Sequence, residues 1–205
     1  HVVCVTSSHF ASAEKEFRFP LDYGNQRPLS ASWTVTGSGA FLVGRQKSHV
    51  RITGVTVGKI VDYGLKDSQN MGACMAPAAA DTILTNLKDF GRSPTSYDRI
   101  ITGDLGYIGQ SILLDFMSKN GHQMRDRHLD CGMKIFDQEK QDTHAGGSGC
   151  GCAAVTLSAY ILPKIQKGEW KRVLFVPTGA LMSTVSYNEG QNIPGIAHGV
   201  IIERE

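Results

Sequence analysis

The sequence contains no apolar run that approaches the roughly 18 to 20 residues of a transmembrane helix, so it predicts no membrane-spanning segment. The formal net charge is only +2 over 205 residues, which gives no reason to expect nucleic acid or an anionic membrane surface as a partner. The opening run, His1–Val5, is typical of a strand rather than of a signal peptide. The five cysteines are an odd number without the spacing of a disulfide framework, so we expect reduced thiols in an intracellular protein.

The composition is that of an ordinary globular protein, with 41% hydrophobic and 20% charged residues. Short apolar or alternating runs predict strands at Val2–Thr6, Trp33–Gly44, His49–Asp62, Tyr97–Gly103, Arg172–Val176 and Ile196–Ile202. A long irregular loop is expected after the first strand, because it carries the breakers Pro20, Gly24 and Pro28.

Helical spacing of apolar residues predicts three helices between these strands. The first is expected to start near Pro77, since proline suits a first turn, and to end at Gly91. The second ends at Gly121, and the third runs from Cys150 to Gln166 with a kink at Pro163. Short apolar strands beside such helices predict a layered α/β fold.

A weak internal repeat suggests two similar halves. The run Val2–Ser7 resembles Val173–Thr178, and each is followed by a glycine-bearing strand, Gly37–Val43 or Ile196–Glu203. A Gly-rich turn and a long helix precede the second copy but not the first. We therefore expect that the chain begins in mid-domain, with a companion helix and strands upstream of it.

Several sequence runs resemble the stage V sporulation protein AD family, which belongs to the thiolase-like superfamily. They are Thr6–His9, Thr34–Ala40, Met75–Thr82, Leu129–Gly132, Ala145–Gly149 and Ile196–Val200. The resemblance extends nearly from end to end, with the motifs in the expected order.

The resemblance implies a thiolase-like layered α/β fold of the order αβαβα, incomplete because the N-terminal portion of the first half is absent. Residues 1–48 would then be the end of the first half and residues 49–205 the second half. The family also implies a homodimer that binds dipicolinic acid and supports its uptake into the developing spore. It further implies a place in the forespore, peripheral to the spore inner membrane, together with other proteins of the same sporulation membrane complex.

The same resemblance argues against catalysis. Condensing enzymes of this superfamily need a nucleophilic cysteine at a helix start, and histidine and asparagine, or two histidines, to stabilise an oxyanion. The family pattern places the nucleophile upstream of His1, and this sequence has Asp104 and Ala145–Gly147 at the other two positions. An aspartate donates no hydrogen bond unless it is protonated. We expect no catalytic residue, cofactor or metal ligand, with calcium as the one ion that could accompany dipicolinate.

The pocket of the superfamily is expected to persist as a ligand site. Its candidate residues are His9, Asp104, Cys131, Gly147, Ser148, Gly149, Thr178 and Gly179. The Gly-rich helix start offers backbone N–H groups to a carboxylate, although such glycines also serve close packing. Asp104 has a second reading as the cap of the following helix, and His9 as an ordinary surface residue.

Other candidates have simpler readings. Cys150 is a reactive thiol at a helix start or, more simply, a packed one. Cys150 and Cys152 point in different directions and are poor joint ligands for one metal, which argues against a zinc site that joins them to Cys131 and His128 or His144.

Three remaining residues are read as structural. His198 lies in an apolar strand and is expected to be a hydrogen-bonded structural histidine, while Met71 and Met75 suit a core or an interface. Two other functions stay open: an active acyltransferase or condensing enzyme whose nucleophile lies upstream, and a scaffold that only recruits membrane partners.

Overall fold

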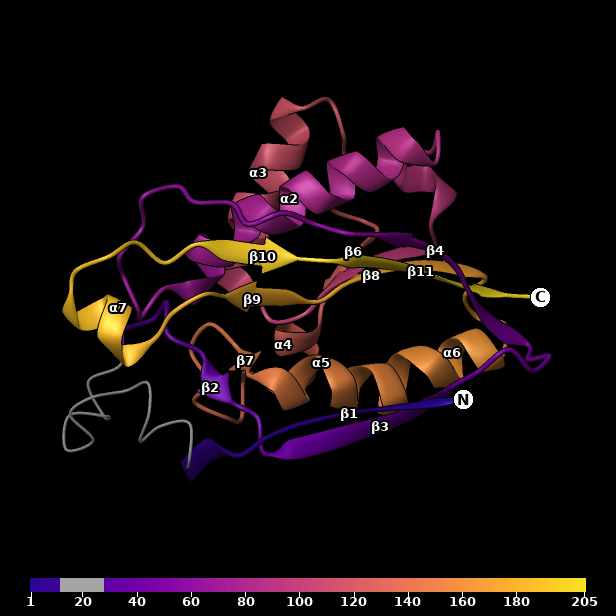
Figure 1. Cartoon of the computed structure of the whole chain (residues 1–205), viewed down its shortest axis with the longest axis horizontal. Helices are drawn as coiled ribbons and strands as arrows, with labels where there is room; N and C mark the ends of the chain where they lie inside the picture. Colours follow the sequence, from indigo (N-terminus) through magenta and orange to yellow (C-terminus); the bar gives the residue numbers. More distant parts are fainter. Residues whose placement is uncertain (12–27) are drawn as a thin grey trace.

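The structure, a computed structural model, describes residues 1–11 and 28–205. At its centre lies a five-stranded sheet (Figure 1). In spatial order its strands are β4 (Val50–Thr56), β11 (Gly199–Arg204), β8 (Arg172–Val176), β5 (Arg99–Thr102) and β6 (His128–Asp130). The strands β8, β5 and β6 are parallel, and β11 is antiparallel to both of its neighbours. Because β5 and β8 are parallel, the loops that follow them leave from the same edge of the sheet.

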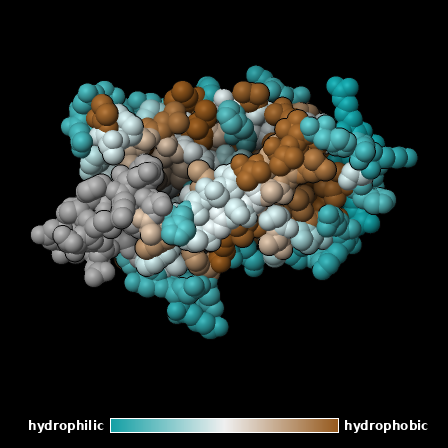
Figure 2. All heavy atoms as spheres, turned by 60° about the horizontal axis from the view of Figure 1, so that its bottom comes forward, coloured by the Kyte–Doolittle hydropathy of each residue, from teal (hydrophilic) through white to brown (hydrophobic). Residues whose placement is uncertain are grey.

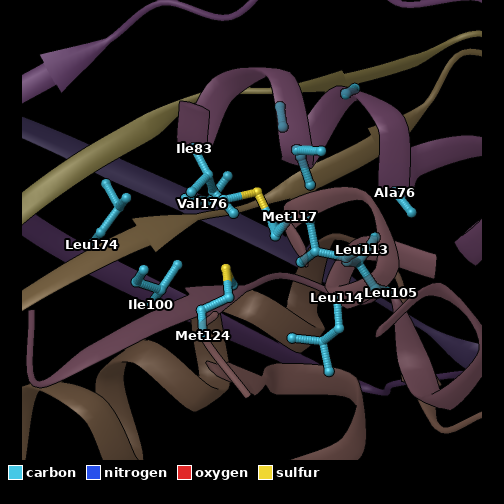
Figure 3. Packing of buried hydrophobic residues seen from close by; sticks show 14 of the residues in the cluster. Ala76, Ile83, Ile100, Leu105, Leu113, Leu114, Met117, Met124, Leu174 and Val176 are labelled. Carbon is cyan, nitrogen blue, oxygen red and sulfur yellow. The ribbon is translucent and has the colours of Figure 1, made fainter. Parts of the chain in front are cut away.

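Helices cover both faces of this sheet. One face carries α2 (Met71–Asp89) and α3 (Gly106–Lys119) (Figure 1). Ile83 of α2 and Met117 of α3 pack there against Leu174 and Ile100 of the strands (Figure 3). The other face carries one continuous helical stretch, made of α5 (Cys150–Thr156), the π-helical turn η3 (Leu157–Ile161) and α6 (Leu162–Gln166).

A second sheet lies on the far side of that stretch. It consists of β1 (Val2–Ser8) and β3 (Gly37–Val43), which pair in antiparallel fashion (Figure 1). A Cβ atom on Gly39 would lie 2.7 Å from Cβ of Ala154, so glycine lets β3 approach α5 closely. The layers therefore run α, β, α, β, and the predicted thiolase-like layered α/β fold is confirmed.

The two copies of the internal repeat lie in different sheets, as expected. The pair β1 and β3 forms the small sheet, while β8 and β11, which are also antiparallel neighbours, lie in the large one. The helical stretch that starts at Cys150 lies between the two pairs (Figure 1). This arrangement agrees with two related halves.

The outer face of the small sheet is apolar and exposed. Val3, Val5 and Leu42 point away from α5 and are 66%, 67% and 70% exposed. Figure 2 shows hydrophobic residues gathered on the face that carries these strands. The companion elements expected to cover this face, and the division into residues 1–48 and 49–205, stay predictions.

The predicted start of the first helix was wrong. α2 begins at Met71, six residues before Pro77, and the side chain of Asn70 accepts a hydrogen bond from the N–H of Ala73 at 3.4 Å. Pro77 lies inside the helix, where it removes one backbone donor. The neighbouring residues Ala76, Ala78 and Ala79 are fully buried. Close packing of this alanine-rich segment against the sheet stabilises a helix that local sequence signals alone would start later.

Other boundaries differ because tertiary pairing interrupts long apolar runs. The predicted strand Trp33–Gly44 is divided into β2 (Trp33–Thr34) and β3, and β2 pairs in parallel with β7 (Gly147–Ser148). The strand expected at His49–Asp62 ends at Thr56. The helix expected from Cys150 to Gln166 is confirmed at both ends, with its π-helical turn immediately before the Pro163 segment.

The last predicted strand is broken at His198 into β10 (Gly195–Ala197) and β11. Nδ1 of His198 accepts a hydrogen bond from the N–H of Gly58 at 3.0 Å, which confirms its structural role. The short elements β9 (Thr178–Ala180), η2 (Pro94–Ser96), α4 (Cys131–Lys134) and α7 (Thr184–Asn188) complete the fold. The loop expected around Pro20 and Gly24 lies outside the described residues.

Candidate ligand pocket

A pocket of about 380 Å³ opens where the loops after β5 and β8 leave the large sheet. The start of α2 lies on one side of it and the start of α5 on the other. Its lining residues are Ser8, Ala31, Ser32, Thr34, Ser68, Gln69, Met71, Met75, Asp104, Ser148, Gly149, Cys150, Ala153, Pro177, Thr178, Gly179, Ala180 and Met182. This position, at the carboxyl ends of parallel strands, is where open α/β sheets usually bind ligands.

Asp104 connects two walls of the pocket. Its Oδ2 accepts a hydrogen bond of 3.0 Å from the N–H of Gly149, the residue before α5. Its Oδ1 accepts one of 2.9 Å from the hydroxyl of Thr178, which begins β9. The Gly149 N–H that was expected to be free for a ligand carboxylate is therefore occupied by a carboxylate of the protein itself.

The start of α5 is also fixed from the small sheet. Oγ of Ser8, the last residue of β1, accepts a hydrogen bond from the N–H of Gly151 at 2.9 Å and donates to the carbonyl of Val35 at 2.6 Å. Gly149 has φ 95°, a conformation that side chains rarely adopt. A Cβ atom on Gly151 would lie 2.5 Å from the carbonyl oxygen of Gly37. Close packing thus accounts for these glycines at least in part.

Burial raises the pKa of Asp104 to about 7, and the nearby carboxylate of Asp130 adds to this shift. The hydrogen bonds from Gly149 and Thr178 act in the opposite direction, because they stabilise the ionised form. Near neutral pH the side chain of Asp104 therefore exists in both protonation states, and its protonated form is able to donate a hydrogen bond.

Asp130 has the capping role that was considered for Asp104. It is buried, and its carboxylate accepts hydrogen bonds from the N–H groups of Leu105 (2.9 Å) and Gly106 (3.0 Å) at the start of α3. The N–H of Met133 in α4 donates to it at 3.3 Å, and the hydroxyl of Thr102 donates at 2.6 Å. Burial raises the pKa of Asp130, whereas these four donors act in the opposite direction because they stabilise its ionised form.

A buried histidine extends this network away from the pocket. The amide of Gln110 lies 2.9 Å from Nδ1 of His128, and Nε2 of His128 lies 3.0 Å from the hydroxyl of Thr102. Because that hydroxyl donates to Asp130, Nε2 of His128 carries the proton and Nδ1 accepts from Gln110. Burial lowers the pKa of His128 to about 4, so the ring is neutral at physiological pH.

The pocket joins a polar side to a sulfur-rich one. Met71 and Met75 of α2, together with Met182 beyond β9, contribute three thioethers to the lining. None of the lining residues identified in the described part of the chain is a lysine, an arginine or a histidine. Asp104 is their only carboxylate, and Cys150 supplies their only thiol.

The structure brings together most of the predicted site residues. Asp104, Ser148, Gly149, Thr178 and Gly179 line the pocket. The other three do not: His9 is exposed beyond the end of β1, Cys131 is fully buried in α4, and Gly147 is buried in β7. Beside two of them a neighbouring residue lines the pocket instead, namely Ser8 next to His9 and Ser148 next to Gly147.

Sequence reasoning missed the contribution of the segments around Ala31 and Gln69. The Ala31 segment is held there by backbone bonds between distant residues, such as those from Trp33 N–H to the Gly146 carbonyl (2.8 Å) and from Ala145 N–H to the Ala31 carbonyl (2.9 Å). The hydroxyl of Ser30 in turn donates to the carbonyl of Gln69 at 3.0 Å. Met71 was assigned to the core or an interface, but it also lines the pocket. Its position four residues before Met75 was the available signal, because this spacing places both side chains on one face of a helix.

The thiols differ in access. Cys150 is exposed and lines the pocket, whereas burial raises the pKa of both Cys131 and Cys152. Among residues 1–11 and 28–205, no group of histidine, cysteine and acidic side chains is arranged to hold a metal ion. Within the same residues, no helix has the length and apolar character needed to cross a bilayer.

Comparison with known proteins identifies the family. The family model of stage V sporulation protein AD matches residues 1–203. The chain belongs to this family. Stage V sporulation protein AD of Bacillus subtilis (strain 168) is 45% identical over 202 residues, which are 98% of this chain and 60% of that relative. The chain therefore spans 60% of the length of this member of the stage V sporulation protein AD family.

Solved structures similar to this family member include a thiolase and an acetyltransferase. Human mitochondrial 3-ketoacyl-CoA thiolase aligns with 85% of this chain and 37% of its own, at 17% identity and a TM-score of 0.48. The acetyl-CoA acetyltransferase of Bacillus anthracis aligns with 86% of this chain and 38% of its own, at 14% identity and a TM-score of 0.47. At these levels of similarity the functions of those enzymes do not transfer to this chain.

Proposed function

We propose that this chain is part of a non-catalytic thiolase-fold protein that binds dipicolinic acid and supports its uptake into the developing spore. The observation that carries the proposal is the pocket at the edge of the large sheet, in a chain whose family is named for sporulation. Its volume of about 380 Å³ suits a small ligand. Its polar side is lined by Ser8, Ser148 and Thr178 beside Asp104. The hydroxyl of Ser8 donates its proton to the Val35 carbonyl and that of Thr178 donates to Asp104.

The charge of the pocket constrains how a dicarboxylate would bind. The lining residues found in the described segments provide no basic side chain, and an ionised Asp104 would repel a dianion. Either a proton on Asp104 or a bridging cation removes this repulsion. A pKa of about 7 makes the proton accessible near neutral pH, and calcium, an ion that prefers oxygen ligands, is the proposed bridge.

The proposed setting follows from the family. We propose a homodimer in the forespore that is peripheral to the spore inner membrane, next to other proteins of the same sporulation membrane complex. The exposed residues Val3, Val5 and Leu42 offer an apolar face for contact with the rest of the protein or with a partner.

The test is calorimetric titration of dipicolinate into the purified protein in its full natural length. We expect saturable binding that is weakened in Ser148→Ala and Thr178→Val, with Ser111→Ala, on the far helix α3, as the matched control. Absence of binding, with and without calcium, would reject the proposal and favour a scaffold that only recruits membrane partners.

One observation favours a second candidate, an active acyltransferase or condensing enzyme whose nucleophile lies upstream of this chain: with a pKa of about 7, Asp104 can carry a proton and donate a hydrogen bond. The exposed thiol of Cys150 lines the pocket at the start of α5. Incubation with acyl-CoA followed by mass spectrometry distinguishes the two functions. The proposed binding protein stays unmodified, whereas an acyl group on any cysteine would establish the enzyme.

A further inference from the structure

Three methionines form one side of the pocket. Met71 and Met75 come from the first two turns of α2, four residues apart and thus on one face of the helix. Met182 follows β9 on the adjoining loop. Met75 is almost fully buried, while Met71 and Met182 are only partly buried and are accessible from the pocket.

Three polar lining residues come from a different layer of the fold, whereas Ser68 and Gln69 lie just before α2. Ser8 ends β1, Thr34 ends β2 and Ser148 ends β7, and these strands lie on the opposite side of the large sheet from α2 (Figure 1). Asp104 and Thr178 lie between the two sides, at the edge of the large sheet. A ligand in this pocket therefore meets serine and threonine side chains on the side of the small sheet, and thioethers next to Ser68 and Gln69 on the side of α2.

We propose that Met71 and Met182 are specificity-determining residues that recognise the flat ring of an aromatic carboxylic acid, while the polar side holds its carboxylates. The inference rests on the proposed function, because it takes the ligand to be an aromatic dicarboxylate. It adds the residues that select an aromatic ring over a saturated one.

The chemistry of the thioether supports this role. Methionine sulfur is polarizable and makes favourable contacts with aromatic rings, and its unbranched side chain adapts to a flat surface. With no basic side chain among the described lining residues, charge contributes little to the choice between two dicarboxylates. Contact with the ring then determines which of two equally charged ligands binds more tightly.

The experiment uses two probes that differ in the ring alone. Benzene-1,3-dicarboxylate and cis-cyclohexane-1,3-dicarboxylate carry the same two carboxylates on rings of the same size. We expect the protein in its full natural length to bind the aromatic probe more tightly. Each of Met71→Leu and Met182→Leu should weaken binding of the aromatic probe by about two- to tenfold and change binding of the saturated probe little.

The control is Met117→Leu, which alters a fully buried core methionine that does not line the pocket. It should preserve the preference for the aromatic ring. Equal affinities of the native protein for both probes, or no binding of either, would overturn ring recognition. So would an unchanged preference in both pocket variants. Dipicolinate, titrated in parallel, decides the proposed function separately, because it can bind without any preference between the two rings.

Discussion

Asp104 and Gly149 are 45 residues apart in the chain, and a hydrogen bond of 3.0 Å joins the carboxylate of the first to the N–H of the second. The bond connects the edge of the large sheet to the start of α5. The start of a helix favours a negative charge, because its backbone N–H groups are free. Here a carboxylate of the protein already occupies it, so we expect the protonation state of Asp104 to influence the stability of the fold and, in the proposed function, the binding of dipicolinate.

Replacement of Asp104 with asparagine should stabilise the protein above neutral pH. The folded-state pKa of about 7 lies above the ordinary value of 3.8, so the native state binds more protons than the unfolded state between these values. The stability that Asp104 contributes is fully present below about pH 4 and is lost as the pH rises towards 7. We expect Asp104→Asn to remove this loss, which is on the order of 1 to 4 kcal/mol at pH 8.

Urea denaturation of wild type and variant at pH 5 and pH 8 measures this effect. The matched control is Asp115→Asn, which removes an exposed carboxylate that pairs with Lys119. The effect of Asp115→Asn on stability, relative to wild type, should be nearly the same at pH 5 and pH 8. If Asp104→Asn changes stability equally at both pH values, the Asp104 carboxyl does not titrate in this range in the folded protein.

His128 should produce the opposite pH dependence. Its folded-state pKa of about 4 lies below the ordinary value of 6.5, so the stability that it contributes is present above pH 6.5 and is lost as the pH falls towards 4. Between about pH 4 and 6.5, His128 therefore makes the stability of the fold rise with pH, whereas Asp104 makes it fall. His128→Gln should destabilise the fold by about 1 to 3 kcal/mol at pH 7. In this variant the rise from His128 no longer offsets the fall in stability that Asp104 causes between these pH values.

The measurement is the same denaturation series, taken from pH 4 to pH 7. In His128→Gln the stability should fall more steeply with rising pH than in wild type, by up to about 1.4 kcal/mol per pH unit. The exposed residue His49, changed to glutamine, serves as a histidine control outside the network. Parallel curves for wild type and His128→Gln would contradict a neutral buried His128.

The sequence predicted the elements whose pattern is local. The run Arg172–Val176 and the stretch from Cys150 to Gln166 keep their predicted bounds, because continuous apolar patterning and a glycine before the helix are both visible in the chain. The start of α2 was misplaced because a buried proline imitates a first turn. The break at His198 was missed because its cause, the bond from Gly58, connects residues that are 140 positions apart.

The site was predicted in part for the same reason. Asp104, Gly149 and Thr178 were identified as candidates, but the bonds that join them span 45 and 74 residues. No local pattern shows that Asp104 accepts a hydrogen bond from the N–H of Gly149. Nor does one show that the cap of α3 is Asp130 and not Asp104. A sequence shows which polar residues follow the strands. Which of these residues form hydrogen bonds with one another depends on how the layers of the fold pack together.

The packing of the two sheets around α5 predicts a strict size limit at Gly151. A Cβ atom there would lie 2.5 Å from the carbonyl oxygen of Gly37 and 2.7 Å from Oγ of Ser8. Gly151→Ala should therefore destabilise the protein by about 1 to 3 kcal/mol. Gly179→Ala is the control, because its nearest contact would be an ordinary 3.5 Å to Ile196. Thermal denaturation that shows equal stability for the two variants would contradict the packing of β1 and β3 on α5.

Calcium provides the last test, because it separates the two ways in which Asp104 can tolerate a dianion. At pH 8 the carboxyl of Asp104 is mostly ionised, since this pH lies above its pKa of about 7. A calcium ion that contacts both the aspartate and dipicolinate would then be needed to offset their repulsion. At pH 6 a proton on Asp104 achieves the same result without the ion.

We therefore expect the purified protein, in its full natural length, to bind dipicolinate more tightly with calcium than with a chelator at pH 8. The difference should shrink at pH 6. Asp104→Asn should show a smaller effect of calcium at both pH values, because it removes the charge and nearly preserves the shape. Calorimetry at each pH, with Asp115→Asn as the control for general effects of charge, provides the measurement. Equal affinities of wild type with calcium and with chelator at pH 8 would leave Asp104 as the residue that fixes Gly149, with no part in bridging a cation.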